Sequence, residues 1–106
     1  MSNPSQAASH AAFDLKANAK IAATMLKAIA NENRLLILCN LEGQELSVTA
    51  LNDQLDLSQS ALSQHLAVLR KDGLVKTRRE SQTIFYSLSD VRASKVIKTL
   101  HELYCV

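Results

Sequence analysis

The residues of this sequence that are best suited to covalent or metal chemistry are two cysteines and a histidine. Cys39 lies in the first half of the chain, and Cys105 is the penultimate residue. His101 precedes Cys105 by four positions, so the two side chains share one face if this segment is a helix. Together with Cys39 they would make a three-ligand zinc site, because thiolate and imidazole are common zinc ligands. A pair of reactive thiols, or a Cys39 that is simply buried, is also compatible with the residues alone.

A cysteine beside a histidine is also the pairing of a thiol nucleophile with its general base. The sequence offers nothing else that such catalysis needs. Gly43 and Gly73 are the only glycines, so there is no glycine-rich phosphate loop, and no oxyanion hole or substrate pocket is evident. We therefore do not expect an enzyme, and no cofactor is implied.

A second group of residues is suited to reading DNA. In the segment 58–71, leucines recur at positions 62, 66 and 69, so one side of a helix is apolar. The opposite side is small and rich in amides, which lets such a helix enter a major groove about 12 Å wide. Glutamine can bond the edge of adenine bidentately, and serine can bond several base edges. The candidate DNA-binding residues of this segment are Gln59, Ser60, Ser63, Gln64, His65 and Lys71.

Charge and position refine these assignments. His65 lies at the flank of the apolar side, so we expect a structural or phosphate-contacting role rather than base readout. Arg78 and Arg79 follow the helix and are candidates for contact with the neighbouring minor groove or phosphates. Residues 58–80 carry five basic and two acidic side chains, net +3, whereas the whole chain is net +2. Such a cluster favours a polyanionic partner, although a solvated charged face gives the same pattern.

The composition places these residues in one small domain. The chain has 106 residues, of which 47% are hydrophobic and 21% charged. Its longest apolar run, residues 35–39, is far shorter than the roughly 20 residues that span a bilayer. With no secretory signal and too few cysteines for a disulfide scaffold, we expect a cytoplasmic protein without a membrane partner. Residues 1–10 are expected to form a disordered tail and residues 11–106 the domain.

Local signals predict the helices that position the candidate residues. Asn31, Ser47 and Ser58 are each expected to cap a helix, and Gly43 and Gly73 are expected to stop the preceding ones. Ser89 or Asp90 is expected to cap the last helix. The predicted helices cover about 11–29, 32–41, 48–55, 59–71 and 91 to near the C-terminus.

Beyond Gly73 the hydrophobic period changes from helical to two. Two short strands joined through Glu80 and Ser81 are therefore predicted to form a hairpin. Two short helices separated by a tight turn and followed by a basic hairpin make a helix-turn-helix with a wing. The predicted fold is mainly α with a small β-hairpin, in the order α-α-α-α-β-β-α.

Three separated segments of the sequence resemble the ArsR/SmtB family of winged-helix repressors. They are LSQSALSQHLAVLRKDGLV at 57–75, RRESQTIFYSLS at 78–89 and IANENRLLIL at 29–38, and the resemblance covers roughly residues 12–106. It implies a homodimeric repressor whose first and last helices form the interface. A two-fold dimer would bind a double-stranded operator whose sequence is an imperfect palindrome, with half-site centres roughly 10–21 base pairs apart.

The metal sites typical of that family are missing from this sequence. Where the family can carry Cys-x-Cys before the recognition helix, this chain has Ser47-Val48-Thr49, and hydroxyls replace soft thiolates poorly. Where a last-helix site would begin with Asp-x-His, this chain has Asp90-Val91-Arg92, and His101 is followed three residues later by Tyr104.

The cysteine pair resembles the dithiol branch of the family, which contains sulfide-responsive, biofilm-associated and haemolysin-regulator proteins. This resemblance implies that Cys39 and Cys105 become bridged by a disulfide or polysulfide, and that operator affinity then falls. The inducer would be a reactive sulfur species or an oxidant. A zinc-type repressor using Cys39, His101 and Cys105 stays an alternative, as does a regulator that displaces another DNA-bound protein.

Overall fold

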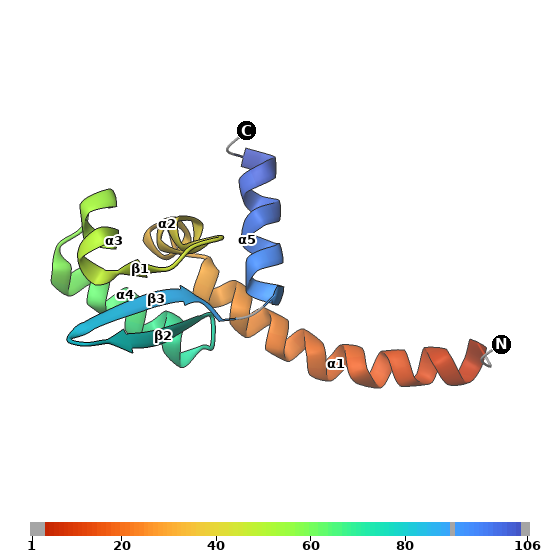
Figure 1. The fold of residues 1–106 in the computed structure, drawn as a ribbon. Helices are drawn as coiled ribbons and strands as arrows, with labels where there is room; N and C mark the ends of the chain where they lie inside the picture. The colour runs from red at the N-terminus through yellow and green to blue at the C-terminus, as the bar shows by residue number, and fades with distance from the viewer. Residues whose placement is uncertain (1–3, 90, 105–106) are drawn as a thin grey trace.

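The computed structural model describes residues 4–89 and 91–104, with side chains from Asp14 onward. Figure 1 shows a group of helices with a small sheet at one side, and the elements follow the order α-α-β-α-α-β-β-α along the chain. The helices and strands are α1 (Pro4–Ile29), α2 (Glu32–Leu41), β1 (Leu46–Ser47), α3 (Val48–Gln54), α4 (Gln59–Lys71), β2 (Val75–Glu80), β3 (Thr83–Leu88) and α5 (Val91–Tyr104).

The predicted caps begin three of the helices. The side chain of Asn31 accepts a hydrogen bond from the Arg34 backbone N–H at the start of α2. Ser47 and Ser58 do the same for α3 and α4, each bonding the N–H three residues on. Such a bond satisfies one of the helix-terminal N–H groups that have no partner within the helix. The predicted bounds of α2 and α4 are confirmed.

Three details differ from the sequence prediction. Helix α1 begins at Pro4, so it includes residues 4–10, which we assigned to a disordered tail. Proline suits the first turn of a helix, and the alanines that follow favour its continuation. The hairpin turns at residues 81–82, with Ser81 at a φ of 58°, and Glu80 is still the last residue of β2. Leu46 and Ser47 form an additional strand, β1.

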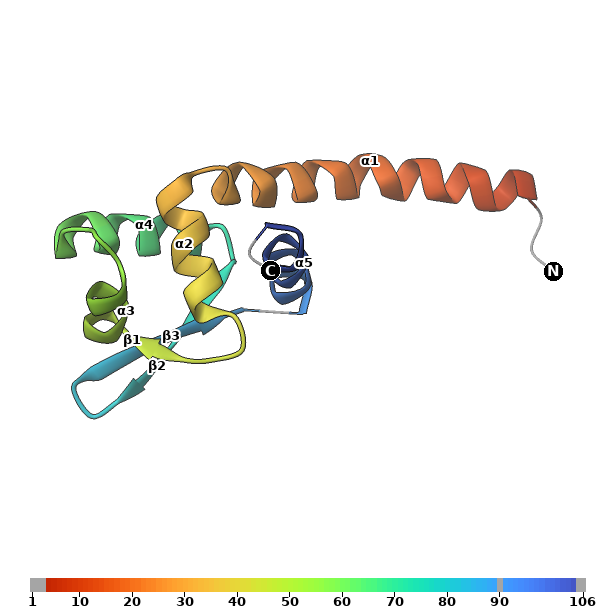
Figure 2. The same ribbon diagram turned by 90° about the horizontal axis from the view of Figure 1, so that it is seen from above.

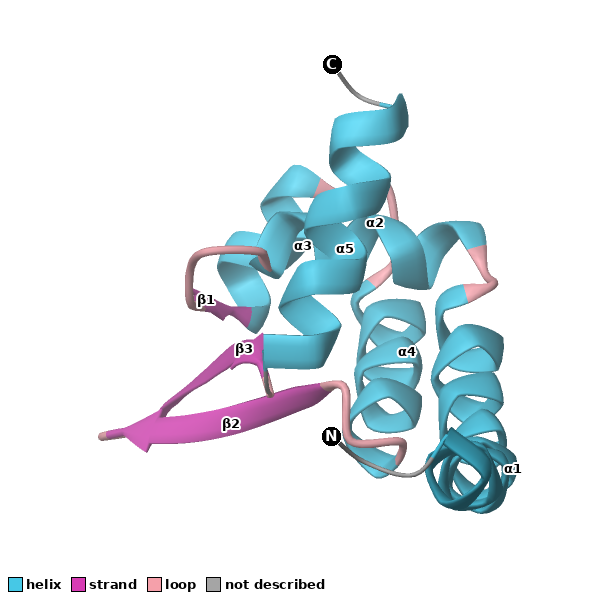
Figure 3. Ribbon diagram, turned by 90° about the vertical axis from the view of Figure 1, so that its right-hand side faces the viewer, coloured by secondary structure: helices cyan, strands magenta, loops and turns pink. Residues whose placement is uncertain are grey.

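The sheet has the strand order β1-β3-β2, and both pairings are antiparallel. In the β2–β3 pair Val75 lies opposite Leu88 and Arg78 opposite Phe85, while β1 places Ser47 opposite Phe85 from the other side. The strands β2 and β3 with their turn are the wing of the molecule. Figure 3 shows the wing projecting to one side of the helices.

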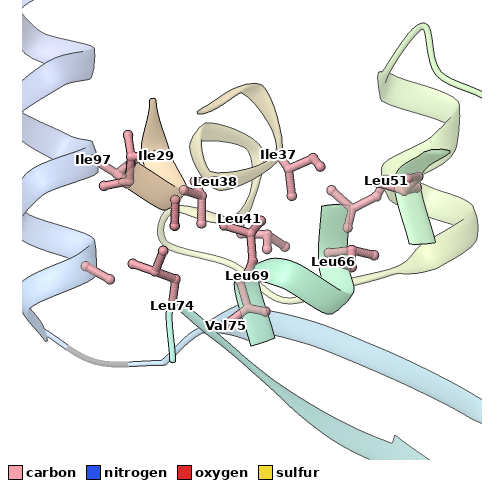
Figure 4. Packing of buried hydrophobic residues seen from close by; sticks show 13 residues of the cluster. Ile29, Ile37, Leu38, Leu41, Leu51, Leu66, Leu69, Leu74, Val75 and Ile97 are labelled. Atoms are coloured by element: carbon pink, nitrogen blue, oxygen red, sulfur yellow. The ribbon is translucent and has the colours of Figure 1, made fainter. Parts of the chain in front are cut away.

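A single apolar core fixes the helices. Leucines and isoleucines from α2, α3, α4 and α5 converge on it, and Figure 4 shows α2 facing α4 across its centre. Burial of each such side chain contributes about 1.5–3 kcal/mol relative to exposure. The fully buried large side chains are Ile37, Leu38, Leu41, Leu51, Leu62, Leu66, Leu69, Leu74 and Ile97.

Helix α1 joins this core only through its last residues. Ala28 and Ile29 are buried, whereas every side chain from Asp14 to Thr24 is exposed. Arg34 ties the end of α1 to α2, since its Nε donates to the Ala28 carbonyl at 2.6 Å. Figure 2 shows the rest of α1 extending away from the body as an arm. No helix among the described residues has the length and hydropathy needed to cross a membrane.

Candidate nucleic-acid interface

The α4 helix presents a polar face to solvent because its leucines are anchored in the core. Leu62, Leu66 and Leu69 have at most 1% of their surface exposed. The opposite side, which we call the outer face of α4, is exposed, and His65 is half-buried at its flank, as the helical wheel predicts. The exposed candidate residues are Gln59, Ser60, Ser63, Gln64 and Lys71.

The outer face also contains an apolar residue that the sequence analysis did not select. Val68 is 38% exposed, although valine is more often buried. It lies four positions after Gln64, so the two residues are neighbours along the same side of the helix. An apolar side chain at this place is suited to contact with a thymine methyl group. In the sequence, only its position outside the leucine stripe indicates that Val68 belongs to the outer face.

The turn before α4 is held by a second residue that the sequence analysis missed. The side-chain amide of Asn52 on α3 donates a hydrogen bond to the Leu57 carbonyl at 2.7 Å. Ser58 then caps α4, and its hydroxyl lies 3.3 Å from that of Ser60. These bonds fix the direction in which α4 leaves the turn, and hence the orientation of its outer face.

The wing places its two arginines in different surroundings. The Arg78 guanidinium forms an ion pair with Glu45 at 2.7 Å and another with Glu80 at 2.9 Å. The hydrogen bond from Arg78 lowers the pKa of Glu45, and the bonds to Glu45 and Glu80 raise the pKa of Arg78. Within the described residues the exposed side chain of Arg79 has neither an ion pair nor a hydrogen bond.

The sequence analysis did not foresee the Arg78–Glu45 pair. Glu45 lies 33 residues before Arg78, just ahead of the unpredicted strand β1. No local pattern connects two residues at that separation. The pairing of β1 with β3 brings them together.

The thiol candidates are only partly within the described residues. Cys39 is half-buried on α2, and Cys105 lies outside the described part of the chain. Cys39 lines a cavity of about 310 Å³ between α2 and α5, together with Glu42, Ile97, Lys98, His101 and Glu102. The structure therefore brings Cys39 and His101 to one cavity. Among the side chains described, those of residues 14–89 and 91–104, no three potential ligand residues are grouped closely enough to hold a metal ion.

Known proteins resemble this chain over most of its length. Residues 31–77 match the model of the bacterial regulatory proteins of the arsR family. The transcriptional activator HlyU of Vibrio cholerae is 56% identical over 87% of this chain and 85% of its own length. A structure of reduced HlyU from the same organism has a TM-score of 0.84 and covers 88% of this chain and 98% of that one, at 56% identity.

Two further solved structures share the fold. The transcriptional repressor BigR of Xylella fastidiosa has a TM-score of 0.79 and 36% identity, covering 88% of this chain and 95% of its own. The homodimeric winged helix-turn-helix domain of Mb0332 from Mycobacterium bovis has a TM-score of 0.75 and 28% identity, covering 85% and 84%. With the exposed outer face of α4 and the projecting wing, these similarities show that the chain belongs to the ArsR family of DNA-binding transcriptional regulators, with a winged helix-turn-helix fold.

Proposed function

We propose that this regulator is a homodimeric repressor that binds an imperfectly palindromic operator and releases it when Cys39 and Cys105 become bridged. The observation that carries the DNA-binding part is the outer face of α4, where Gln64 and Ser60 are exposed on a helix anchored by buried leucines. In this proposal α4 enters the major groove and the wing lies beside it, over the flanking backbone. His65, at the flank, contacts phosphate or supports the helix.

The proposed dimer is supported by apolar surface that one copy leaves uncovered. Leu15, Ile21 and Leu26 on α1 are each more than half exposed, and so are Leu103 and Tyr104 on α5. Exposed apolar surface of this extent on an extended arm is typical of a protein interface. A second copy related by two-fold symmetry would cover α1 and α5 of both chains and present two α4 helices to one side. Homodimerisation of the Mb0332 domain is consistent with this arrangement.

The proposed switch rests on the place of Cys39. Its half-buried position on α2 opens to the cavity shared with His101 of α5, and Cys105 follows His101 by four residues in the sequence. In the proposed reaction the Cys105 thiolate attacks a sulfur of a polysulfide, forms a Cys105 persulfide and expels a shorter polysulfide. The Cys39 thiolate then attacks Sγ of the Cys105 persulfide, forms the Cys39–Cys105 disulfide and expels the outer sulfur as hydrosulfide. The two thiols are oxidised, and the polysulfide is reduced.

A bridge between α2 and the end of α5 would connect the core to the proposed dimer interface. The bridge would thereby change the angle between the α4 helices of the two chains. The free energy required is small, because a tenfold loss of operator affinity corresponds to about 1.4 kcal/mol.

Operator affinity, measured with and without polysulfide, tests the switch in the wild type, in Cys39→Ser and in Cys105→Ser. We expect polysulfide to weaken wild-type binding, and each variant to bind the operator but not respond. The intact mass of the treated wild type should fall by two hydrogen atoms, and each extra sulfur atom kept in the bridge should add its own mass. Neither variant should show the mass of the bridged form. Release of DNA from either single variant would exclude the dithiol switch.

Two alternative functions, a zinc-type repressor and a regulator that displaces another DNA-bound protein, each have a specific observation in their favour. Cys39 and His101 line one cavity, so a zinc-type repressor would use them with Cys105, and zinc instead of polysulfide would then release the operator. The relative HlyU is named a transcriptional activator. If this chain works by displacing another DNA-bound protein, transcription in a purified system should be unaffected by the regulator alone and rise only when that protein is present.

A further inference from the structure

The guanidinium of Arg78 lies at the centre of the most extensive polar side-chain cluster of the wing. Its Nε donates to both carboxylate oxygens of Glu45, at 3.1 and 3.2 Å, and its Nη2 donates to Oε1 of Glu45 at 2.7 Å. Nη1 donates to Glu80 at 2.9 Å, within the same strand. The carbon at the centre of the guanidinium lies 4.8 Å from the centroid of the Phe85 ring. Carboxylates and a ring thus contact the guanidinium on several sides.

This cluster extends across the whole sheet. Arg78 is on β2, Phe85 is opposite it on the central strand β3, and Glu45 precedes β1 on the far side. The side chain therefore reaches over β3 to connect the two outer strands. Strand β1 leads directly into α3, the helix that holds the turn before α4 through Asn52. The cluster consequently ties the wing to the helix-turn-helix.

The charges of the cluster make Arg78 a poor contact for DNA. One guanidinium and two carboxylates sum to −1, so the cluster as a unit does not attract phosphate. Arg79 is the next residue along the strand, and successive strand side chains point to opposite faces of the sheet. Its guanidinium is exposed and, within the described residues, makes no ion pair or side-chain hydrogen bond. The two arginines thus differ in both partner and direction.

We propose that Arg78 is a positioning residue, which together with Glu45 clamps the wing against β1, and that Arg79, rather than Arg78, contacts the DNA backbone. This inference rests on operator binding through α4 and the wing, and it changes the role that the sequence predicted for Arg78. Glu45 acquires a part in DNA affinity although it carries the charge that DNA repels.

The substitution Glu45→Gln separates the two roles of Arg78 by the sign of its effect. If Arg78 contacts phosphate, neutralising Glu45 removes a repulsive charge, frees the guanidinium and tightens operator binding. If Arg78 is the clamp, Glu45→Gln loosens the wing and weakens binding, by about threefold to tenfold for a dimer with two wings. Tighter or unchanged binding would overturn the proposal.

Arginine substitutions provide the matched control. We expect Arg79→Gln to reduce the slope of log affinity against log salt by about 0.9 per protomer, and Arg78→Gln to leave the slope unchanged. The double variant Glu45→Gln/Arg78→Gln should bind about as well as Arg78→Gln alone, because both remove the same clamp. A reduced salt slope in Arg78→Gln, or additive losses in the double variant, would contradict the clamp.

A measurement without DNA distinguishes failure of the clamp from failure of the proposed operator binding. Amide hydrogen exchange in the wing, residues 75–88, should be faster in Glu45→Gln and Arg78→Gln than in the wild type, and unchanged in Arg79→Gln. Exchange in α4 should be equal in all four proteins, which also shows that they are folded. Equal exchange of the wing in all four would overturn the clamp whatever the DNA result.

Discussion

At the scale of single residues, the outer face of α4 separates positions suited to base contact from positions suited to phosphate contact. Gln64 is exposed near the middle of the helix, and its amide both donates and accepts, which is what bidentate bonding to adenine needs. Lys71 is exposed at the last turn and carries only a point charge. The two residues belong to one helix but should affect DNA binding differently.

We expect Gln64→Ala to weaken binding to the specific operator by about 1–3 kcal/mol and to relax the preference at one base pair in each half-site. Lys71→Gln, on the same helix, should weaken binding to specific and to random DNA equally and reduce the salt slope by about 0.9 per protomer. Titrations of both variants with operator and with random DNA, at several salt concentrations, measure this difference. Equal losses on both DNAs for Gln64→Ala would show that Gln64 does not read a base.

At the scale of the secondary-structure elements, the start of α4 determines where the outer face begins. The hydroxyl of Ser58 accepts a hydrogen bond from the Ala61 N–H at 3.1 Å. An alanine at position 58 would have no side-chain acceptor for this N–H. Ser63, one turn further along, is exposed and forms no side-chain hydrogen bond with the described residues. The two serines therefore differ in what their hydroxyls do for the helix.

Ser58→Ala should lower the free energy of unfolding by about 0.5–2 kcal/mol, because the N–H of residue 61 loses its partner. Ser63→Ala is the matched control and should change it by less than about 0.5 kcal/mol. Urea unfolding followed by circular dichroism gives both values, at one protein concentration, since association would add to the apparent stability. The same loss in both variants would mean that the Ser58 bond is not a stabilising cap.

At the scale of the whole molecule, the chain is more extended than a compact domain of its size. Its radius of gyration is 16.8 Å, whereas about 13 Å is usual for this length. The excess comes from α1, whose N-terminal end and the wing tip lie at opposite ends of the molecule (Figures 1 and 2). A helix whose leucines are exposed gains little stability from packing, which is the main source of helix stability in proteins. A second copy would supply the missing contacts.

We therefore expect Leu103→Glu to convert the protein from a dimer to a monomer, since it places a charge in the proposed α5 interface. Gln54→Glu adds the same charge at an exposed position of α3 and should leave the dimer intact. Sedimentation velocity over a range of concentrations measures the oligomeric state of each. A wild-type monomer, or a dimer that survives Leu103→Glu unchanged, would contradict an interface through this part of α5.

Much of the fold could be predicted from the sequence because its signals are local. Asn31, Ser47 and Ser58 act on backbone groups within three residues, so their caps need no knowledge of the rest of the chain. The leucine spacing of residues 62, 66 and 69 likewise predicts which side of α4 is buried, and hence which residues are exposed. The order of helices and the wing follows from the same periodicities. DNA contact by the exposed residues remains a prediction.

The tertiary structure decided what depends on residues far apart in the chain. Strand β1 has only two residues, too few for a periodic signal, and exists because β3 pairs with it. That pairing brings Glu45 to Arg78 across 33 residues and gives Arg78 ion-pair partners that the neighbouring Arg79 lacks among the described residues. The attachment of α1 to α2 likewise includes the bond from Arg34 to the Ala28 carbonyl, which joins residues of two elements. Local propensity specifies where helices begin and which face is apolar, but ion pairs between elements depend on distances that only packing sets.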